Sequence, residues 1–169
     1  MTRRKKENVR QLYLIAEGQA DEKAPVLNEM KRPLSSEGVT NVLSLLEEIK
    51  ERKLACPDLI LCSSGLCARQ TLDLLYEAWP ACDIVFKDSL YGAIDYRIFD
   101  VVKVLDDILF RIMIVTENTA LMPFAAYLVN GLTKKIPKIT PASCAVLSLN
   151  PKESWHNLGP KKAVLEDFF

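Results

Sequence analysis

Three short polar segments carry the side chains in this sequence that could do chemistry. Glu17 follows an apolar run at 12–15, Cys67 lies shortly after a run at 59–62, and Glu117 follows a run at 110–115. Carboxylates transfer protons, bind hard cations or, in some phosphotransferases, attack phosphorus. A thiol reacts only as a thiolate, and nearby carboxylates oppose its ionisation. The set therefore favours carboxylate chemistry over cysteine catalysis, and the only histidine, His156, lies far along the chain in a loop-like segment.

These side chains can meet only if the runs before them belong to one sheet. Apolar runs at 12–15, 59–62, 83–86, 110–115 and 145–149 predict strands, the first two of them buried and the last nearer an edge. Apolar residues at helical spacing lie between the runs, so we expect an α/β fold, a three-layer α/β/α sandwich with a mostly parallel central sheet. Ligands of such sheets bind outside the carboxyl ends of the strands, which is where Glu17, Cys67 and Glu117 fall.

Four helices are expected between the strands. The first begins at Ser35 or Ser36, whose hydroxyl can cap it, has Leu43 on its apolar face and stops by Pro57. A second follows the tight turn at 63–65 and extends to residue 79. A third covers 98–108, and a fourth covers 121–128 and stops at Asn130-Gly131.

Composition narrows the class of protein. The chain has 169 residues, with 22 Lys and Arg against 22 Asp and Glu, so we expect one domain over 1–169, a basic flexible tail at 1–9 and no attraction to nucleic acid. No apolar run is long enough to cross a bilayer, and we expect no membrane association and no cofactor. Five cysteines without a CxxC pair predict reduced thiols and a cytoplasmic protein.

Six segments, in this order, resemble the signature of the histidine phosphatase (phosphoglycerate mutase-like) superfamily, and most closely its SixA-type phosphohistidine phosphatase branch. The segment at 12–20 resembles the family's opening strand with its Arg-His-Gly, and 31–38 resembles its RPL(T/S)xxG helix start. The segment at 63–71 resembles SPxxRAxQT, 88–93 resembles its LY stretch, 115–118 stands where the family has VGHN, and 140–155 fits its final part. The resemblance covers nearly the whole chain and implies the same fold.

The departures from the family's pattern fall on the positions that carry its chemistry. The resemblance implies a nucleophilic histidine, two arginines that bind phosphoryl oxygens and a second histidine that stabilises charge. In this sequence Glu17 stands at the nucleophile's position, Ala16 and Cys67 at those of the arginines, and Glu117 at that of the second histidine. The flanking residues match, and among them Gly18, Ser63 and Asn118 are expected to line the pocket.

The substitutions reverse the charge of the expected pocket. A carboxylate about 4 Å from a phosphoryl group repels it by roughly 4 kcal/mol per unit charge at an effective dielectric of 20. Two close carboxylates also raise one another's pKa. Arg69 is expected to point away from the pocket, and Arg32, in a shared motif, does not offset two glutamates. We therefore expect a protein without the family's activity, whether the changes are natural or engineered.

Three hypotheses remain open on the sequence. The first is a non-catalytic relative of the phosphohistidine phosphatases, whose partner is a phosphohistidine-carrying signalling or phosphotransfer protein, or which binds a small cation. The second is an active phosphatase of phosphohistidine or phosphoamidate with a rebuilt, metal-dependent site at Glu17, Glu117 and Asp21. The third is a binding module that uses another surface, which nothing in the sequence marks.

Overall fold

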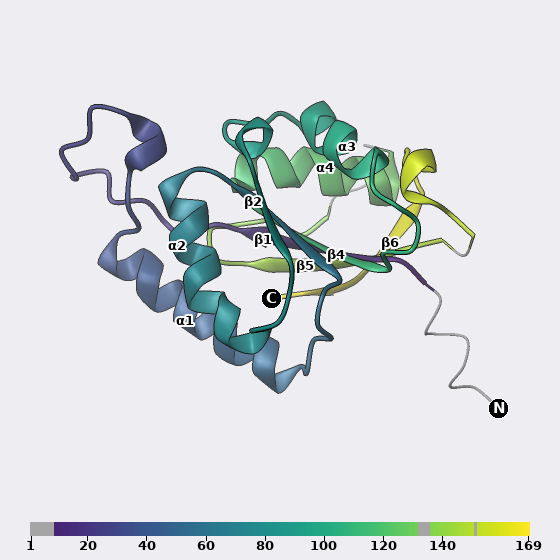
Figure 1. The fold of residues 1–169 in the computed structure, drawn as a ribbon, viewed down its shortest axis with the longest axis horizontal. Coiled ribbons are helices and arrows are strands. Elements are labelled where there is room, and N and C mark those ends of the chain that lie inside the picture. Colours follow the sequence, from purple (N-terminus) through teal and green to yellow (C-terminus); the bar gives the residue numbers. More distant parts are fainter. Residues whose placement is uncertain (1–8, 132–135, 151) are drawn as a thin grey trace.

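A six-stranded sheet forms the centre of the computed structural model, which describes residues 9–131, 136–150 and 152–169 (Figure 1). In sheet order the strands are β3 (Ile84–Lys87), β2 (Leu59–Ser63), β4 (Arg111–Thr116), β1 (Gln11–Ala16), β5 (Cys144–Leu149) and β6 (Ala163–Phe168). Strands β3, β2, β4 and β1 are parallel, β5 runs antiparallel to β1, and β6 runs antiparallel to β5. The expected mostly parallel sheet is confirmed.

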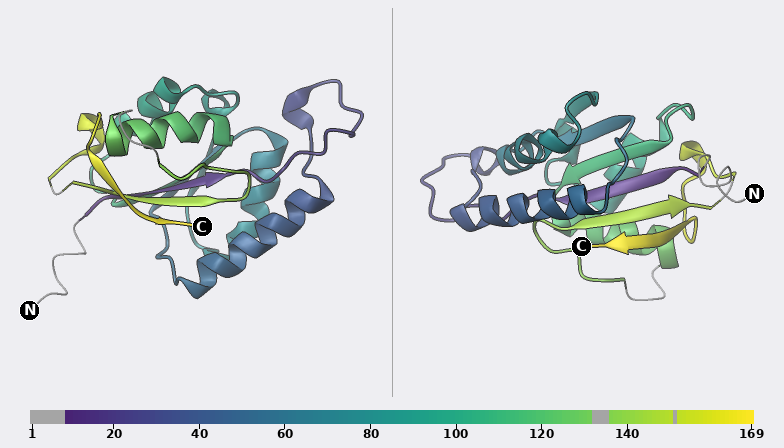
Figure 2. Two further views of the ribbon diagram at one scale, coloured as in Figure 1. Left: turned by 180° about the vertical axis from the view of Figure 1, so that it is seen from behind. Right: turned by 90° about the horizontal axis from the view of Figure 1, so that it is seen from below.

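Helices cover both faces of this sheet, as Figure 2 shows. One layer consists of α1 (Ser36–Glu51) and α2 (Leu66–Leu75), and the other of α3 (Asp95–Lys103) and α4 (Asn118–Asn130). Successive residues of β1 alternate between the layers: Leu12 and Leu14 pack with α3 and α4, whereas Tyr13 and Ile15 pack with α1 and α2. Short 3-10 turns complete the described elements: η1 (Glu29–Lys31), η2 (Tyr76–Ala78), η3 (Asp88–Leu90) and η4 (Trp155–Asn157).

The helix ends follow the sequence signals closely. The Ser35 hydroxyl accepts a hydrogen bond from the Gly38 N–H at 2.9 Å and caps α1. Gly131 adopts the left-handed conformation, with φ of 59°, and ends α4 as expected. The buried face of α1 differs in one residue from the expected one, because Leu45 is buried and Leu43 is 44% exposed.

Three expectations about the elements are wrong. The third helix ends at Lys103, because the Leu105 N–H bonds to the Val102 carbonyl in a tight turn, and Ile108 lies outside it. Trp79 is buried but follows the second helix, which ends at Leu75. The strand at 145–149 is not the last: β6 follows it at the edge of the sheet, where exposed acidic residues obscure the apolar pattern.

The parallel register brings three strand ends together. Ala16 at the end of β1 lies opposite Thr116 at the end of β4, and Cys62 of β2 lies opposite Val115 of β4. The loops that leave these strands therefore meet at one edge of the sheet, where the sequence predicts the pocket. Among the described residues, no helix is long and apolar enough to cross a membrane.

Candidate functional site

A cavity of about 260 Å³ opens where these three loops meet. Its wall contains residues from the ends of β1, β2 and β4 and from two further loops: Glu17, Ala20, Glu29, Met30, Arg32, Gly65, Leu66, Cys67, Tyr91 and Glu117. Three of these side chains are carboxylic acids and one is a guanidinium. The structure thus brings together Glu17, Cys67 and Glu117, as the sequence predicts.

Glu17 is the carboxylic acid of the cavity whose pKa is raised by its surroundings. Its N–H bonds to the Thr116 carbonyl at 3.0 Å, which extends the β1–β4 pairing by one residue and fixes where its side chain starts. Burial and then the charge of Glu117 raise the pKa of Glu17 to about 7. Within the described part of the chain, no hydrogen-bond donor contacts its carboxyl group, so none of these residues offsets the effects of burial and of Glu117. Close to neutral pH, Glu17 therefore exchanges a proton with solvent.

Glu117 is held in place by its neighbours. One carboxylate oxygen, Oε1, accepts a hydrogen bond from the Gly92 N–H at 3.1 Å, and Oε2 accepts one from the Thr119 hydroxyl at 3.4 Å. Gly92 has a φ of 56°, a conformation that a residue with a side chain rarely adopts. The loop after β3 is thus tied to the start of α4 through this carboxylate, which is stabilised on the wall of the cavity.

Arg32 is the one arginine among the described residues of the wall, and its donors are already engaged. Its Nε and Nη2 atoms donate to the two carboxylate oxygens of Glu29 at 2.7 and 2.6 Å. Its Nη1 atom donates to the carbonyl oxygens of Asp21 at 2.8 Å and Ala24 at 3.3 Å. A forked arginine–carboxylate pair of this kind uses the geometry that would otherwise bind a phosphoryl group. Arg32 therefore braces the 21–32 loop and offers little positive charge to the cavity.

Cys67 lies in the first turn of α2 and is almost fully buried. Its thiol donates to the Arg32 carbonyl at 3.2 Å. Burial and then the charge of Glu17 raise the pKa of Cys67 to about 12; Arg32 opposes this shift, and Glu117 adds the smallest contribution to it. The expectation that the carboxylates suppress a thiolate here agrees with this geometry, and cysteine catalysis is disfavoured.

Comparison with solved structures decides the fold. A protein described as the phosphohistidine phosphatase SixA of Nakamurella multipartitia superposes with a TM-score of 0.81 at 20% identity, over 95% of each chain. One described as SixA of Agrobacterium tumefaciens gives 0.76 at 22% identity, over 95% of this chain and 97% of that one. The protein histidine phosphatase SixA in complex with tungstate gives 0.75 at 16% identity, over 94% and 95%.

The chain has the SixA fold. The expected phosphoglycerate mutase-like α/β/α architecture is therefore confirmed. Neither a protein-family model nor a curated protein sequence matches this chain, so the likeness is carried by the structure.

The other residues expected at the site lie beside the cavity of this SixA fold rather than in its described wall. Ala16 is fully buried and packs in the core beneath α3 and α4. Gly18 and Ser63 are buried below the wall, where the Gly18 N–H donates to the Thr71 hydroxyl at 2.9 Å. Asn118 lines a neighbouring apolar groove and donates to the Ile139 carbonyl at 3.3 Å.

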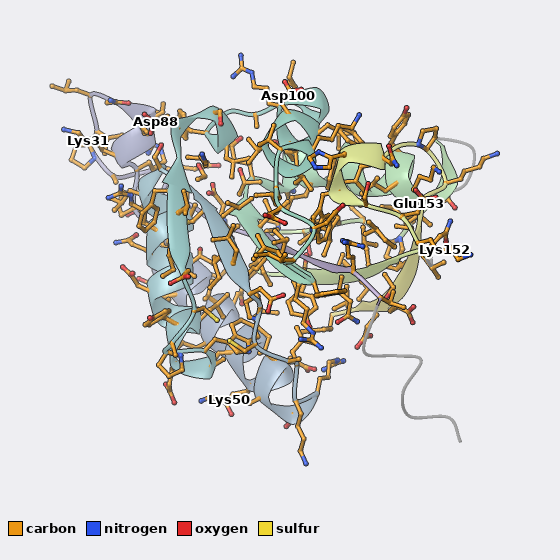
Figure 3. The ribbon with its side chains drawn as sticks, turned by 45° about the vertical axis from the view of Figure 1, so that its right-hand side comes forward. Lys31, Lys50, Asp88, Asp100, Lys152 and Glu153 are labelled. Carbon is orange, nitrogen blue, oxygen red and sulfur yellow. The ribbon has the colours of Figure 1, made fainter. Side chains whose placement is uncertain are left out.

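Arg69 and His156 could have supplied the site with a positive charge or an imidazole, but both side chains lie outside the described wall of the cavity. The guanidinium of Arg69 stacks on the Phe86 ring at 4.5 Å from its centroid, in agreement with the expectation that it points away. His156 is exposed in η4. Figure 3 places Glu153, just before η4, on the opposite side of the molecule from Lys31 of η1, whose turn also contains the cavity residues Glu29 and Met30.

Sequence reasoning missed Glu29 as a residue of the wall. The 21–32 loop reaches the cavity because Ala20 pairs with Leu34 in an isolated antiparallel bridge, a contact that no local pattern reveals. The spacing of Glu29 and Arg32, three residues apart in a loop, is the one available signal, and it is weak. Tyr91 lies in a segment that resembles the family's pattern, but the resemblance implied no role for it. It packs against Gly65, where an added Cβ would lie 2.9 Å from the Tyr91 ring.

The proposed metal ligands do not form a recognisable metal centre. Among the residues that the structure describes, no group of three or more His, Cys, Asp or Glu side chains is arranged to hold a metal ion. Asp21 lines a separate hollow with Gln19 and Glu22. Glu17 and Glu117 alone give two carboxylates, fewer oxygen ligands than a dedicated magnesium or calcium site uses.

Proposed function

We propose that this chain is a catalytically inactive relative of the SixA phosphohistidine phosphatases. The observation that carries the proposal is the composition of the cavity wall: it presents Glu17 and Glu117 to the interior, and the guanidinium of Arg32 is paired with Glu29. A protein with this fold binds tungstate, a dianion that resembles phosphate. The charge of Glu117, and that of Glu17 in its ionised form, repel a dianion, and no imidazole lies in the described wall to accept a phosphoryl group.

The negative charges of the cavity wall also favour one form of a partner protein over another. Phosphohistidine brings a dianion to the cavity mouth, whereas an unphosphorylated histidine is neutral or cationic near neutral pH and meets no repulsion. We therefore propose a phosphohistidine-carrying signalling or phosphotransfer protein as the partner, bound in its unphosphorylated form. Binding of a histidine phosphotransfer domain before and after its phosphorylation measures this preference directly, and tighter binding of the phosphorylated form would contradict it.

Hydrolysis of a phosphohistidine protein by the unaltered chain is the primary test. We expect no turnover with or without added magnesium or manganese, and no shift in melting temperature with tungstate. Metal-independent turnover would overturn the proposal, and turnover that requires a divalent metal would instead support a rebuilt site at Glu17 and Glu117. An active SixA phosphatase assayed in parallel confirms that the substrate is competent.

Variants of the cavity wall distinguish the effect of its negative charge from the effect of the missing catalytic side chains. Glu17→Gln with Glu117→Gln removes the repulsion without adding a nucleophile, so we expect tungstate affinity to rise at least tenfold, equivalent to about 1.4 kcal/mol, with no turnover. Glu17→His, Cys67→Arg and Glu117→His together should add phosphate binding and slow hydrolysis. Ala16→Arg is made last, because its side chain starts in the buried core and the variant needs a check of folding by circular dichroism.

A further inference from the structure

The strand β3 forms an edge of the sheet and exposes apolar side chains. Among the described strands only β2 pairs with it, and Val85 and Phe86 are 38% and 44% exposed. The strand crosses the foreground of Figure 1 with no other element in front of it, and in Figure 3 it descends from the labelled Asp88 on the left of the view. Unpaired backbone groups beside exposed apolar side chains are a template for pairing with another strand.

The opposite edge of the sheet is protected in ways that β3 is not. The pairing of β6 with β5 shifts register at Val146 and Leu147, an irregularity of the kind that twists an edge away from other chains. β6 also exposes the acidic residues Glu166 and Asp167. On β3 the only charge is Lys87 at its end. The Arg69 guanidinium of α2 lies over one face of the Phe86 ring, and among the described strands only β2 pairs with the backbone of β3, so its outer backbone edge is open to a partner strand.

An exposed apolar surface continues from β3 onto the neighbouring helix. A hollow of about 260 Å³ lies between the end of β3 and α3, and its wall combines the apolar side chains of Val101, Val104 and Leu105 with polar ones at the rim: Lys87, Ser89, Arg97 and Asp100. Val104 is 77% exposed, and Val85 pairs with Leu61, which packs in the core on this same side of the sheet. β3 has only four residues, and this adjoining surface supplies the apolar area that such a short strand lacks.

The backbone directions of β3 fix how a second strand can pair with it. The Ile60 N–H bonds to the Asp83 carbonyl at 2.8 Å, and Ile60 is in register with Ile84. In a parallel ladder alternate residues face the partner, so residues 83, 85 and 87 bond to β2. The N–H and C=O groups of Ile84 and Phe86 consequently point to the open edge.

We propose that two copies of this chain pair through β3 about a two-fold axis at Val85, forming one continuous sheet across both molecules. In this antiparallel register Ile84 of each copy faces Phe86 of the other, and their outward backbone groups exchange hydrogen bonds. Val85 meets Val85 of the second copy as the central non-hydrogen-bonded pair, on the α3 side. A self-complementary edge of this kind is what a two-fold dimer requires.

Charge complementarity selects this partner and this register. With Val85 at the centre, Asp83 of each copy lies opposite Lys87 of the other, which gives two intermolecular ion pairs. Within the part of the chain that the structure describes, no ion pair engages either residue. The register centred on Phe86 would leave Asp83 without this basic neighbour, so opposite charges and apolar contacts agree on one arrangement.

Sedimentation velocity of the full chain over a concentration series tests the dimer. We expect the unaltered chain to be dimeric and Val85→Lys to be monomeric at the same concentrations, since it places two like charges at the axis. Val164→Lys, the matched change on exposed β6, should leave the dimer intact. A monomer at every concentration, or a dimer that survives Val85→Lys, would overturn the proposal.

A charge exchange and a cross-link test the register. Lys87→Asp alone should weaken the dimer, and Asp83→Lys combined with Lys87→Asp should restore it. In a Cys56→Ser background, which removes the exposed native thiol, Val85→Cys should form an intermolecular disulfide, because directly opposite non-hydrogen-bonded residues have Cα atoms about 4.5 Å apart. Phe86→Cys should not. Cross-linking through position 86, or no rescue by the exchange, would reject the register.

Discussion

At the scale of single residues, the environment of Glu17 links the cavity to the stability of the fold. Burial and the neighbouring charge of Glu117 raise its pKa to about 7, from an ordinary value of 4.5. Between these two pH values the folded protein holds a proton that the unfolded chain has lost. The free energy of unfolding therefore falls as the pH rises from 4.5 to 7, and above pH 7 the loss is complete.

Glu17→Gln removes this pH-dependent loss. We expect the variant to be more stable than the unaltered chain at pH 8, by up to about 3 kcal/mol, and to gain nothing at pH 4. Urea unfolding at several pH values measures the difference. Glu51→Gln, an exposed change at the end of α1, should keep the parental slope, and an unchanged slope in Glu17→Gln would contradict the assigned cause.

Thiol reactivity reports on the same environment. Four of the five cysteines are buried, Cys56 is exposed, and burial with two carboxylates raises the pKa of Cys67 to about 12. Ellman's reagent should label one thiol quickly in the folded protein and five after denaturation. Fast labelling of Cys67, identified by mass spectrometry, would show that the thiol is accessible and ionised, against the structure.

At the scale of elements, the start of α1 is positioned by the absence of a side chain at Gly38. An added Cβ there would overlap the carbonyl oxygen of Gln19, in the loop that leads from β1 toward the cavity. The Ser35 cap lies in the same turn, and its N–H bonds to that Gln19 carbonyl at 2.9 Å. Close contact between α1 and this loop thus holds the wall of the cavity against the first helix.

Gly38→Ala should consequently destabilise the protein, although alanine favours helices. We expect a loss of about 2 kcal/mol, the usual range for a forced steric overlap in a packed site, measured by urea unfolding. Gly159→Ala is the matched control, because its added Cβ would meet no atom closer than 3.9 Å. Equal effects of the two changes would mean that α1 and the loop can separate without cost.

At the scale of the whole molecule, the two hydrophobic cores share one sheet. Trp155 is buried in the core beneath α3 and α4, and Trp79 in the core beneath α1 and α2. The four central strands β2, β4, β1 and β5 supply alternate residues to both cores, so one core cannot lose these strands while the other keeps them. The chain should then unfold as one cooperative unit, as the predicted single domain requires.

The two tryptophans make this testable. In Trp79→Phe the remaining fluorescence reports one core, and in Trp155→Phe it reports the other. Within each variant, we expect the fluorescence transition in urea to coincide with the transition in far-ultraviolet circular dichroism. Separate midpoints for the two signals would show that the layers unfold independently and would argue for more than one folding unit.

The sequence alone determined the order of the main elements and where the polar groups would meet. Continuous apolar runs identified five strands, because strands buried between two layers are apolar on both faces. A capping serine located the start of α1. The rule that ligands bind at the carboxyl ends of parallel strands then placed Glu17, Cys67 and Glu117 together. Both inferences use only neighbours along the chain and the parallel direction expected of strands that alternate with helices.

Tertiary structure alone decided which groups face the cavity and which edge of the sheet is open. The Glu29–Arg32 pair reaches the cavity wall because a bridge between Ala20 and Leu34 folds their loop back on itself, and Ala16 is buried in the core although its neighbour Glu17 lines the cavity. β6 and the exposed edge of β3 likewise depend on strand order. These features are contacts between residues distant in sequence, and a local repeat carries no record of them.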